Sequence, residues 1–148
     1  MDSVGKVGKW IYDVLSQPSR VFGDLPPCPF AKKSWDEGGI DVLDFRSWDD
    51  VEEHLDILQD VMIFMMEDIS SEELVERARY FNNKYPHLVF LEEHPDLVEE
   101  FDGVTVNSGY TMLIVQDRKH LVDSRKLLED TDYYYHWSPE LKQRILDR

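Results

Sequence analysis

The chain has almost no cysteine, because Cys28 is the single thiol among 148 residues. One cysteine cannot form an intrachain disulfide, so we expect the fold to depend on a packed core rather than on covalent bridges. No apolar run approaches the roughly 18 residues that a membrane span requires. The first residues, "MDSVGKVGKWIYDVL", carry charges too closely spaced for a secretory signal. These absences predict a cytoplasmic protein with no membrane partner.

Several motifs that mark common enzyme classes are also missing. The chain has no glycine-rich phosphate loop, no Gly-x-Ser-x-Gly nucleophile elbow and no metalloprotease helix motif. It has no internal repeat, no low-complexity tract and no linker long enough to separate two domains. We therefore expect one domain over 1–148 and no metal site. The sequence leaves any cofactor unknown.

Positive charge is scarce, because 16 Lys and Arg residues stand against 31 Asp and Glu residues, for a formal net charge of −15. Such a charge repels polyanions, so we expect no direct nucleic-acid binding and no anionic membrane surface as a partner. The excess lies in residues 36–76, which hold fifteen acidic residues and one arginine. This acidic segment is interpreted as a solvated surface, as an adaptation to salt, or as a docking surface for a basic protein partner, including a mimic of the nucleic-acid backbone.

Residues 1–39 predict an N-terminal helical segment. Apolar residues of 7–15 recur at helical spacing, and the helix is expected to end before Pro18. The proline-containing stretch that follows is expected to be extended. A short second helix is predicted after Cys28, and Gly38 with Gly39 would stop it.

From residue 40 onward, short apolar runs alternate with capped helical patterns. One strand is a nearly continuous apolar run, which is typical of a strand covered on both faces. The predicted strands are 40–45, 61–66, 87–93 and 110–116. Helices are predicted after Ser47, after Ser70 with Glu73 as a capping box, over 119–130, and from Ser138 onward.

This alternation predicts an α/β fold: a single layered domain with a sheet of about four strands flanked by helices. The pattern does not fix the strand order, so a ferredoxin-like and a thioredoxin-like arrangement both stay open. In either arrangement, residues 1–39 are an N-terminal helical extension that carries Cys28, and residues 40–148 are the body of strands and helices.

Cys28 lies in an unusual neighbourhood, "LPPCPFAKKSW" (25–35). If the cysteine caps the short helix, Pro29 takes the first helical position, where no amide proton is needed. The thiol then lies at the positive end of the helix, and Lys32 and Lys33 add positive charge one turn further on. Both influences favour the thiolate, so the pattern predicts a reactive cysteine supported by two lysines.

Two resemblances rest on this segment. "CPFAKK" (28–33) resembles the active-site segment of omega-class glutathione transferases and single-cysteine glutaredoxins, in which Cys-Pro-Phe begins the first helix. Together with "HPD" (94–96) and "GVTVNSGYTMLIV" (103–115), it also resembles the bacterial domain-of-unknown-function family 1415, as a distant relative. The second resemblance implies that Cys28, His94 and Asn107 lie near one another, and it implies no particular reaction.

His94 and Asp96 follow a predicted strand at its carboxyl end, where open α/β sheets usually place ligands. If Cys28 meets His94 there, with Asn107 or Asp96 orienting the imidazole, the groups form a nucleophile, a base and an orienting residue. The alternative is a buried, unreactive cysteine, with "HPD" as a turn that starts a helix over "DLVEEF" (96–101).

The segment "DTDYYYHW" (130–137) gathers four aromatic residues and a histidine. Its rings, Tyr134 among them, are candidates for stacking on a planar ligand or partner, or for covering the end of the sheet as a small secondary core. The isolated histidines His54, His120 and His136 are interpreted as surface residues.

Two classes of function follow from these observations. The first is a thiol-dependent enzyme or small-molecule-binding protein that uses Cys28, with His94 as the base and Lys32 as electrostatic support. The second is a non-catalytic interaction module that offers the acidic segment to a partner. The sequence by itself does not decide whether the protein is an enzyme.

Overall fold

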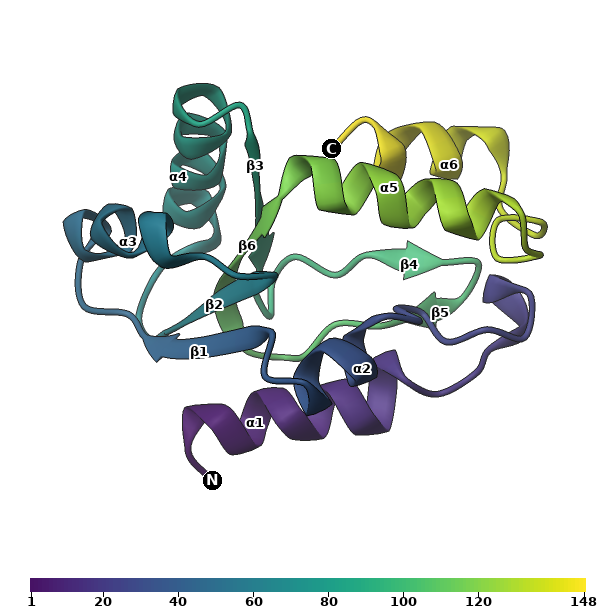
Figure 1. The fold of residues 1–148 in the computed structure, drawn as a ribbon, viewed down its shortest axis with the longest axis horizontal. Helices are drawn as coiled ribbons and strands as arrows, with labels where there is room; N and C mark the ends of the chain where they lie inside the picture. The colour runs from purple at the N-terminus through teal and green to yellow at the C-terminus, as the bar shows by residue number, and fades with distance from the viewer.

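A computed structural model describes residues 1–148 and confirms the α/β fold class. Figure 1 shows a central sheet with helices packed around it. The main sheet contains β1 (Ile40–Asp44), β2 (Val61–Met66), β3 (Leu88–Glu93) and β6 (Thr111–Asp117), and a separate hairpin contains β4 (Glu100–Phe101) and β5 (Val104–Thr105). The helices are α1 (Ser3–Trp10), α2 (Ala31–Asp36), α3 (Trp48–His54), α4 (Ser71–Lys84), α5 (Arg118–Glu129) and α6 (Pro139–Leu146), with shorter turns η1 (Ile11–Leu15), η2 (Arg20–Phe22) and η3 (Leu55–Ile57).

The four predicted strands are confirmed, as are the predicted serine caps Ser47, Ser70 and Ser138. The Ser47 hydroxyl accepts from the Asp50 N–H at 3.1 Å, and the Ser70 hydroxyl accepts from the Glu73 N–H at 3.1 Å. Each bond satisfies one of the N–H groups that a helix start leaves without an intrahelical partner. The sequence therefore located these helix starts from local chemistry alone.

The helix expected over 96–101 as one alternative does not form. A loop leads instead into the β4–β5 hairpin, whose turn is Asp102-Gly103. Both turn residues have positive φ, 51° for Asp102 and 86° for Gly103. An Asp-Gly pair with positive φ at both positions suits the tight turns that join antiparallel strands, so this turn chemistry outweighed the helical pattern before it.

The strand order in the main sheet is β1-β2-β6-β3. β1 and β2 are parallel, while β6 lies between β2 and β3 and is antiparallel to both. The carboxyl ends of β1, β2 and β3 consequently share one end of the sheet, and their amino ends share the other. Because α4 separates β2 from β3, the chain departs from the β-α-β-β-α-β order of a ferredoxin-like domain. The order β1-β2-β6-β3 therefore describes this sheet better than the ferredoxin-like name.

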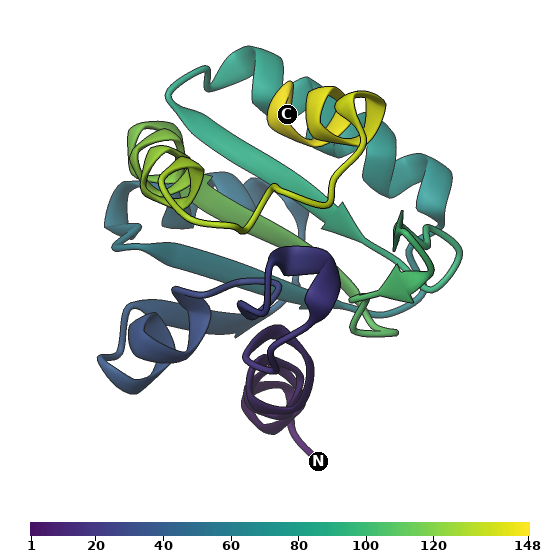
Figure 2. The same cartoon turned by 90° about the vertical axis from the view of Figure 1, so that its right-hand side faces the viewer.

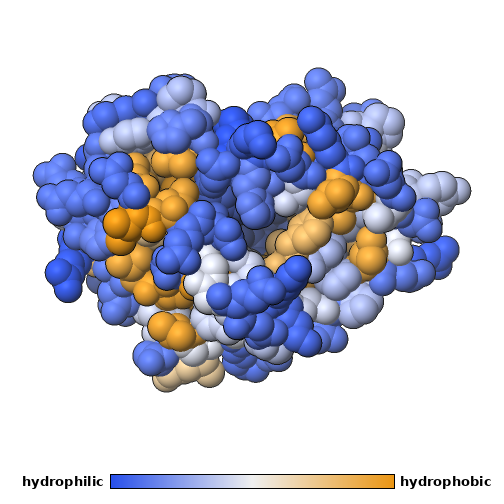
Figure 3. All heavy atoms as spheres, viewed as in Figure 1, coloured by the Kyte–Doolittle hydropathy of each residue, from blue (hydrophilic) through white to orange (hydrophobic).

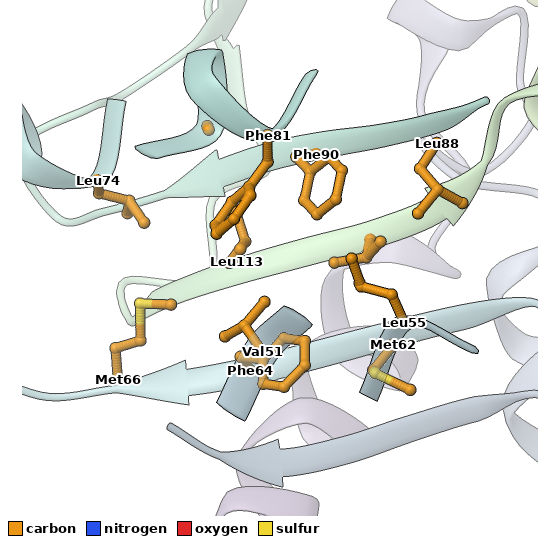
Figure 4. Close-up of a cluster of buried hydrophobic side chains, with 12 residues drawn as sticks. Val51, Leu55, Met62, Phe64, Met66, Leu74, Phe81, Leu88, Phe90 and Leu113 are labelled. Carbon is orange, nitrogen blue, oxygen red and sulfur yellow. The ribbon is translucent and has the colours of Figure 1, made fainter. Parts of the chain in front are cut away.

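Side chains of β2 alternate between two apolar cores, one on each face of the sheet. Phe64 points to the core beneath α3 and α4, where it meets Leu74, Phe81 and Phe90. Figure 4 shows this cluster from α4, β2, β3 and β6. Ile63 points to the opposite face, which α1 and α2 cover. β2 is therefore buried on both faces, as its continuous apolar run predicts.

A third, smaller core joins the two ends of the chain. Its buried members are Phe22, Phe101, Leu128 and Tyr133. Figure 2 shows the η2 region beside the loop that follows α5, where these residues meet.

Each helix of the structure falls short of the length and apolar content that a membrane-crossing helix needs.

Candidate functional site

An apolar cavity of about 150 Å³ lies between the N-terminal helices, the sheet and α5. Eleven of the 16 residues that line it are hydrophobic, and Cys28 is one of the residues in its wall. The space-filling view shows a recess on this face, between α5 and the region of α2. The cavity is the most apolar concave site that also contains a potentially reactive side chain.

One wall of the cavity follows directly from helical spacing, and the sheet forms its floor. Trp10, Ile11 and Leu15 project from α1 and η1 on the face that the sequence predicts to be apolar. The floor comes from the sheet and includes Ile40 and Val61, which are the first residues of β1 and β2. The cavity therefore opens at the amino ends of these parallel strands.

The remaining wall comes from the end of β6 and the start of α5. His120 and Ser124 are four residues apart, so they lie on one side of α5 with Leu121 between them in sequence, and all three line the cavity. Gln116 of β6 also lines it. These residues add hydrogen-bonding groups to an otherwise apolar site. The sequence interpretation missed His120, although the spacing of 120, 121 and 124 marks one helical face.

Cys28 does not cap α2, which corrects the expected position. The helix begins at Ala31, and its N-cap residue is Phe30. The Cys28 N–H donates to the Leu15 carbonyl at 3.1 Å, and the Cys28 carbonyl accepts from the Ala31 N–H at 3.2 Å. The cysteine therefore closes a turn that ties the end of η1 to the start of α2.

Burial raises the pKa of the Cys28 thiol above its ordinary value of 9.0. The backbone N–H groups of Phe30 and Ala31 act in the opposite direction, because they favour the thiolate, but their effect is smaller than that of desolvation. The expected direction of the pKa shift is therefore wrong. At neutral pH the group in the cavity wall is a protonated thiol.

Lys32 and Lys33 do not support the thiolate. Both side chains are exposed, and neither lines the cavity. The Lys32 ammonium lies 5.5 Å from the centre of the Tyr12 ring. Since these lysines extend from α2 into solvent, their charge is screened by water and is not directed at the sulfur.

His94 lies at the opposite end of the sheet from Cys28. It follows Glu93, which pairs with Met112 at the far end of β6, whereas the cavity is lined by Gln116. The His94 Nε2–H donates to the Ile69 carbonyl at 2.9 Å, and Nδ1 accepts from the Asp96 N–H at 3.0 Å. Both ring nitrogens are occupied, so His94 orders a turn and has no free nitrogen for a base.

Asn107 braces the same loop. Its amide oxygen accepts from the Glu99 N–H at 3.2 Å, and its amide nitrogen donates to the Leu97 carbonyl at 3.1 Å and to the Glu93 carboxylate at 3.4 Å. The Asp96 side chain is largely exposed, and one carboxylate oxygen lies 3.8 Å from His94 Nδ1. His94 and Asn107 thus both hydrogen-bond to the segment 96–99, and Cys28 takes no part in it.

Glu93 contributes a partly buried carboxylate to this loop. It accepts from the Ser108 N–H at 2.9 Å and from the Ser108 hydroxyl at 3.0 Å. Burial raises the pKa of Glu93, and these hydrogen bonds counteract part of that shift. The donors, Asn107 and Ser108, lie in the segment between β5 and β6, so Glu93 at the end of β3 anchors that segment.

Tyr134 belongs to the third core, as the second alternative for its segment predicts. Its ring packs edge-to-face against Tyr133 and Trp137, with centroid distances of 4.9 Å in both cases. The Lys142 ammonium lies 5.1 Å from the Tyr134 ring. The neighbouring Tyr133 hydroxyl donates to the Pro27 carbonyl, next to Cys28. The aromatic segment thereby fixes the backbone that carries the cysteine.

The cavity is interpreted from its own geometry, because no family model, no curated protein and no solved structure matches the chain. No three His, Cys, Asp or Glu side chains gather in a group suited to a metal ion. The pKa of the Cys28 thiol is set by burial and by two backbone N–H groups, and no imidazole contributes to it. The site has the chemistry of a binding cavity: apolar walls, a neutral thiol and a few hydrogen-bonding groups.

Proposed function

We propose that the protein binds a small, mostly apolar molecule in the cavity that Cys28 lines. The observation that carries this proposal is an apolar cavity with hydrogen-bonding groups on one wall, which is the usual composition of a small-molecule site. Cys28 serves as a neutral part of the wall. This is the small-molecule-binding form of the function expected from the sequence, without thiol catalysis.

Two features favour binding over catalysis. A raised thiol pKa lowers the fraction of nucleophilic thiolate at neutral pH. The base expected from the sequence, His94, already uses both ring nitrogens at the other end of the sheet. A thiol enzyme needs an activated sulfur and a base hydrogen-bonded to it. The Cys28 sulfur is not activated, and no hydrogen bond joins it to His120, the histidine that lines the same cavity.

The size of the cavity limits the ligand. A volume of about 150 Å³ accommodates a molecule on the order of one aromatic ring. Gln116, His120 and Ser124 supply both hydrogen-bond donors and acceptors on one wall. The ligand class is therefore a single-ring aromatic, or a compact aliphatic of similar volume, with one polar substituent.

Titration of isotope-labelled protein with p-cresol and cyclohexanol tests this proposal. We expect saturable NMR shifts of the Ala31, Val61 and Ser124 amides, with dissociation constants in roughly the micromolar to millimolar range for so few atoms. Shifts spread evenly over the surface, or no saturation up to the solubility limit of both probes, would contradict it.

Two variants of α5 locate the binding. Ser124→Leu adds an apolar side chain to the cavity wall and should weaken p-cresol binding at least tenfold. Val122→Leu is the matched control, because Val122 is exposed on the same helix and does not line the cavity. Equal affinities in the two variants would place the ligand elsewhere.

A further inference from the structure

The two edge strands of the main sheet differ in how their outward backbone groups are satisfied. On β3, the Arg118 N–H donates to the His87 carbonyl, so by alternation Leu88, Phe90 and Glu92 direct their backbone groups away from β6. These outward groups face the edge of the sheet. Unsatisfied groups of this kind are the template on which another chain adds a strand.

The β3 edge is closed by groups from its own chain. The Asn82 side chain accepts from the Phe90 N–H at 2.8 Å and donates to the Phe90 carbonyl at 2.9 Å, as a neighbouring strand would. The Leu88 N–H donates to the Tyr85 carbonyl, and the Leu88 carbonyl accepts from Arg118 at 3.3 Å. The outward groups of Leu88 and Phe90 are therefore all satisfied.

The β1 edge is open. The Val61 N–H donates to the Gly39 carbonyl and the Phe45 N–H donates to the Met65 carbonyl, which shows that the odd-numbered residues of β1 face β2. By the same alternation, the N–H and C=O groups of Ile40, Val42 and Asp44 point away from the sheet. None of these outward groups takes part in a backbone hydrogen bond of the loops and turns, and β1 has no second neighbouring strand.

A groove runs beside this open edge. Its volume is about 470 Å³, and its lining includes Val42, Leu43 and His54 together with Ile57. Ile57, next to this edge, is 62% exposed. In Figure 3, apolar side chains gather on the face over η3 and β1. A strand added to β1 would cover part of this apolar surface.

The charge around the edge selects the partner. β1 itself carries Asp41 and Asp44, and it lies within the acidic segment 36–76, where one arginine accompanies fifteen acidic residues. A second copy of the chain added at this edge would bring two such segments together, and like charges would oppose that contact. A segment rich in lysine or arginine is attracted instead.

We propose that the β1 edge receives an extended basic segment of another protein as a fifth strand of the sheet. Backbone hydrogen bonds to Ile40, Val42 and Asp44 supply the pairing, and alternate apolar side chains of the segment cover Leu43 and Ile57. The two sites share Ile40, whose side chain lines the Cys28 cavity while its outward backbone groups face the sheet edge. The proposal rests on the edge and its charge, so it does not depend on the proposed small-molecule function.

A ten-residue peptide of alternating lysine and valine tests the proposal at 150 mM salt. The control peptide has the same sequence with alternating L and D residues, which keeps the charge but prevents a regular strand. We expect the all-L peptide to slow hydrogen exchange of the Ile40, Val42 and Asp44 amides at least tenfold, and the control peptide to leave them unchanged. Equal binding of both peptides without protection of these amides would show simple charge attraction and overturn the proposal.

Two variants with matched exposure locate the contact. Ile57→Ser should weaken binding of the all-L peptide about threefold to tenfold, while Leu127→Ser on α5, at the same 62% exposure, should leave it unchanged. Val42→Pro removes one outward N–H and should weaken binding at least tenfold, since an edge strand tolerates proline. Unchanged affinity in Ile57→Ser and Val42→Pro would contradict the proposal, as would protection of the β1 amides by self-association of the protein alone.

Discussion

The two ends of the four-stranded sheet are built from different chemistry. At the amino ends of β1 and β2, apolar side chains surround a cavity, and the Cys28 thiol stays protonated because burial raises its pKa. At the carboxyl ends, the polar side chains of His94 and Asn107 form hydrogen bonds to the backbone of the loop between β3 and β4, and His94 also bonds the Ile69 carbonyl between β2 and α4. The difference shows that the polar side chains His94 and Asn107 are used to hold loops in place, while the cavity lies where the chain is apolar.

The polar end also explains why a histidine near a strand end is not a ligand site here. Open α/β sheets usually bind ligands beyond the carboxyl ends of their strands. In this protein the loop from 94 to 99 occupies part of that region and uses the polar side chains to satisfy its own backbone. A buried backbone group without a partner costs free energy, so this use has a direct stabilising effect.

Replacement of Asn107 tests the structural role of the polar end and has the largest expected effect. Asn107→Ala removes three hydrogen bonds and should lower the free energy of unfolding by about 2 kcal/mol in urea denaturation. Asn83→Ala, at an exposed position of α4, is the control and should change it by less than about 0.5 kcal/mol. Equal losses of unfolding free energy in Asn107→Ala and Asn83→Ala would contradict a structural role for the polar end of the sheet. p-Cresol binding in the Cys28 cavity should be unaffected in both variants.

The reactivity of the thiol tests the apolar end. At pH 7, iodoacetamide should alkylate Cys28 at least about tenfold more slowly in the native protein than in the unfolded chain, which corresponds to about 1.4 kcal/mol. Because the thiolate is the reacting form and the native pKa is raised above its ordinary value of 9.0, the rate should go on rising with pH beyond pH 9 and should not level off there. Rapid alkylation of native protein at pH 6 to 7 would instead support a thiol enzyme.

The raised pKa of Cys28 also sets the sign of the pH dependence of the free energy of unfolding. Below pH 9 the thiol is protonated in both states, so it contributes nothing to the change with pH. Above pH 9 the unfolded chain loses the proton first, and the free energy of unfolding should therefore fall as pH rises. Cys28→Ala should remove this contribution, which is measured as the difference between the two proteins in urea denaturation at pH 8 and pH 10.

Replacement of His94 tests whether its side chain stabilises a turn or acts as a base. His94→Ala should cost about 1 kcal/mol of unfolding free energy, because the Ile69 carbonyl and the Asp96 N–H both lose a partner. His94→Asn should recover about half of that loss, since an asparagine oxygen also accepts from the N–H two residues later. The alkylation rate of Cys28 should be the same in both variants. A change of rate would show that the two ends of the sheet communicate.

The lysines beside Cys28 give the smallest expected effect. Lys32→Ala and Lys33→Ala should change the alkylation rate less than about twofold and the unfolding free energy by less than about 0.5 kcal/mol, as is usual for exposed charges. Lys32 should show the larger change of the two, since it also contacts the Tyr12 ring. A tenfold slower reaction in either variant would mean that its ammonium group does act on the thiol.

Much of the fold was predictable because its signals are local. Ser47 and Ser70 mark helix starts through bonds to residues three positions later, and the apolar run 61–66 marks a buried strand by composition. The helix considered over 96–101 does not form, and the reason is again local. Asp102-Gly103 is a turn signal that belongs to the β4–β5 hairpin, which forms in place of this helix.

The candidate site was less predictable because it depends on contacts between distant residues. Cys28 and His120 line one cavity although 91 residues lie between them in sequence, and no local pattern connects them. The thiol pKa depends on how much water the folded chain removes from around the sulfur, which a neighbouring lysine or helix start does not reveal.

The sequence by itself determined the class of fold, the positions of the strands and of the serine helix caps, and the concentration of negative charge in residues 36–76. These properties follow from hydrogen bonds and periodicity within a few residues, or from composition. Only the tertiary structure decided the strand order, the protonation state of Cys28, the separation of Cys28 from His94 and the difference between the closed β3 edge and the open β1 edge. Each of these depends on burial and on pairing between segments that are far apart along the chain.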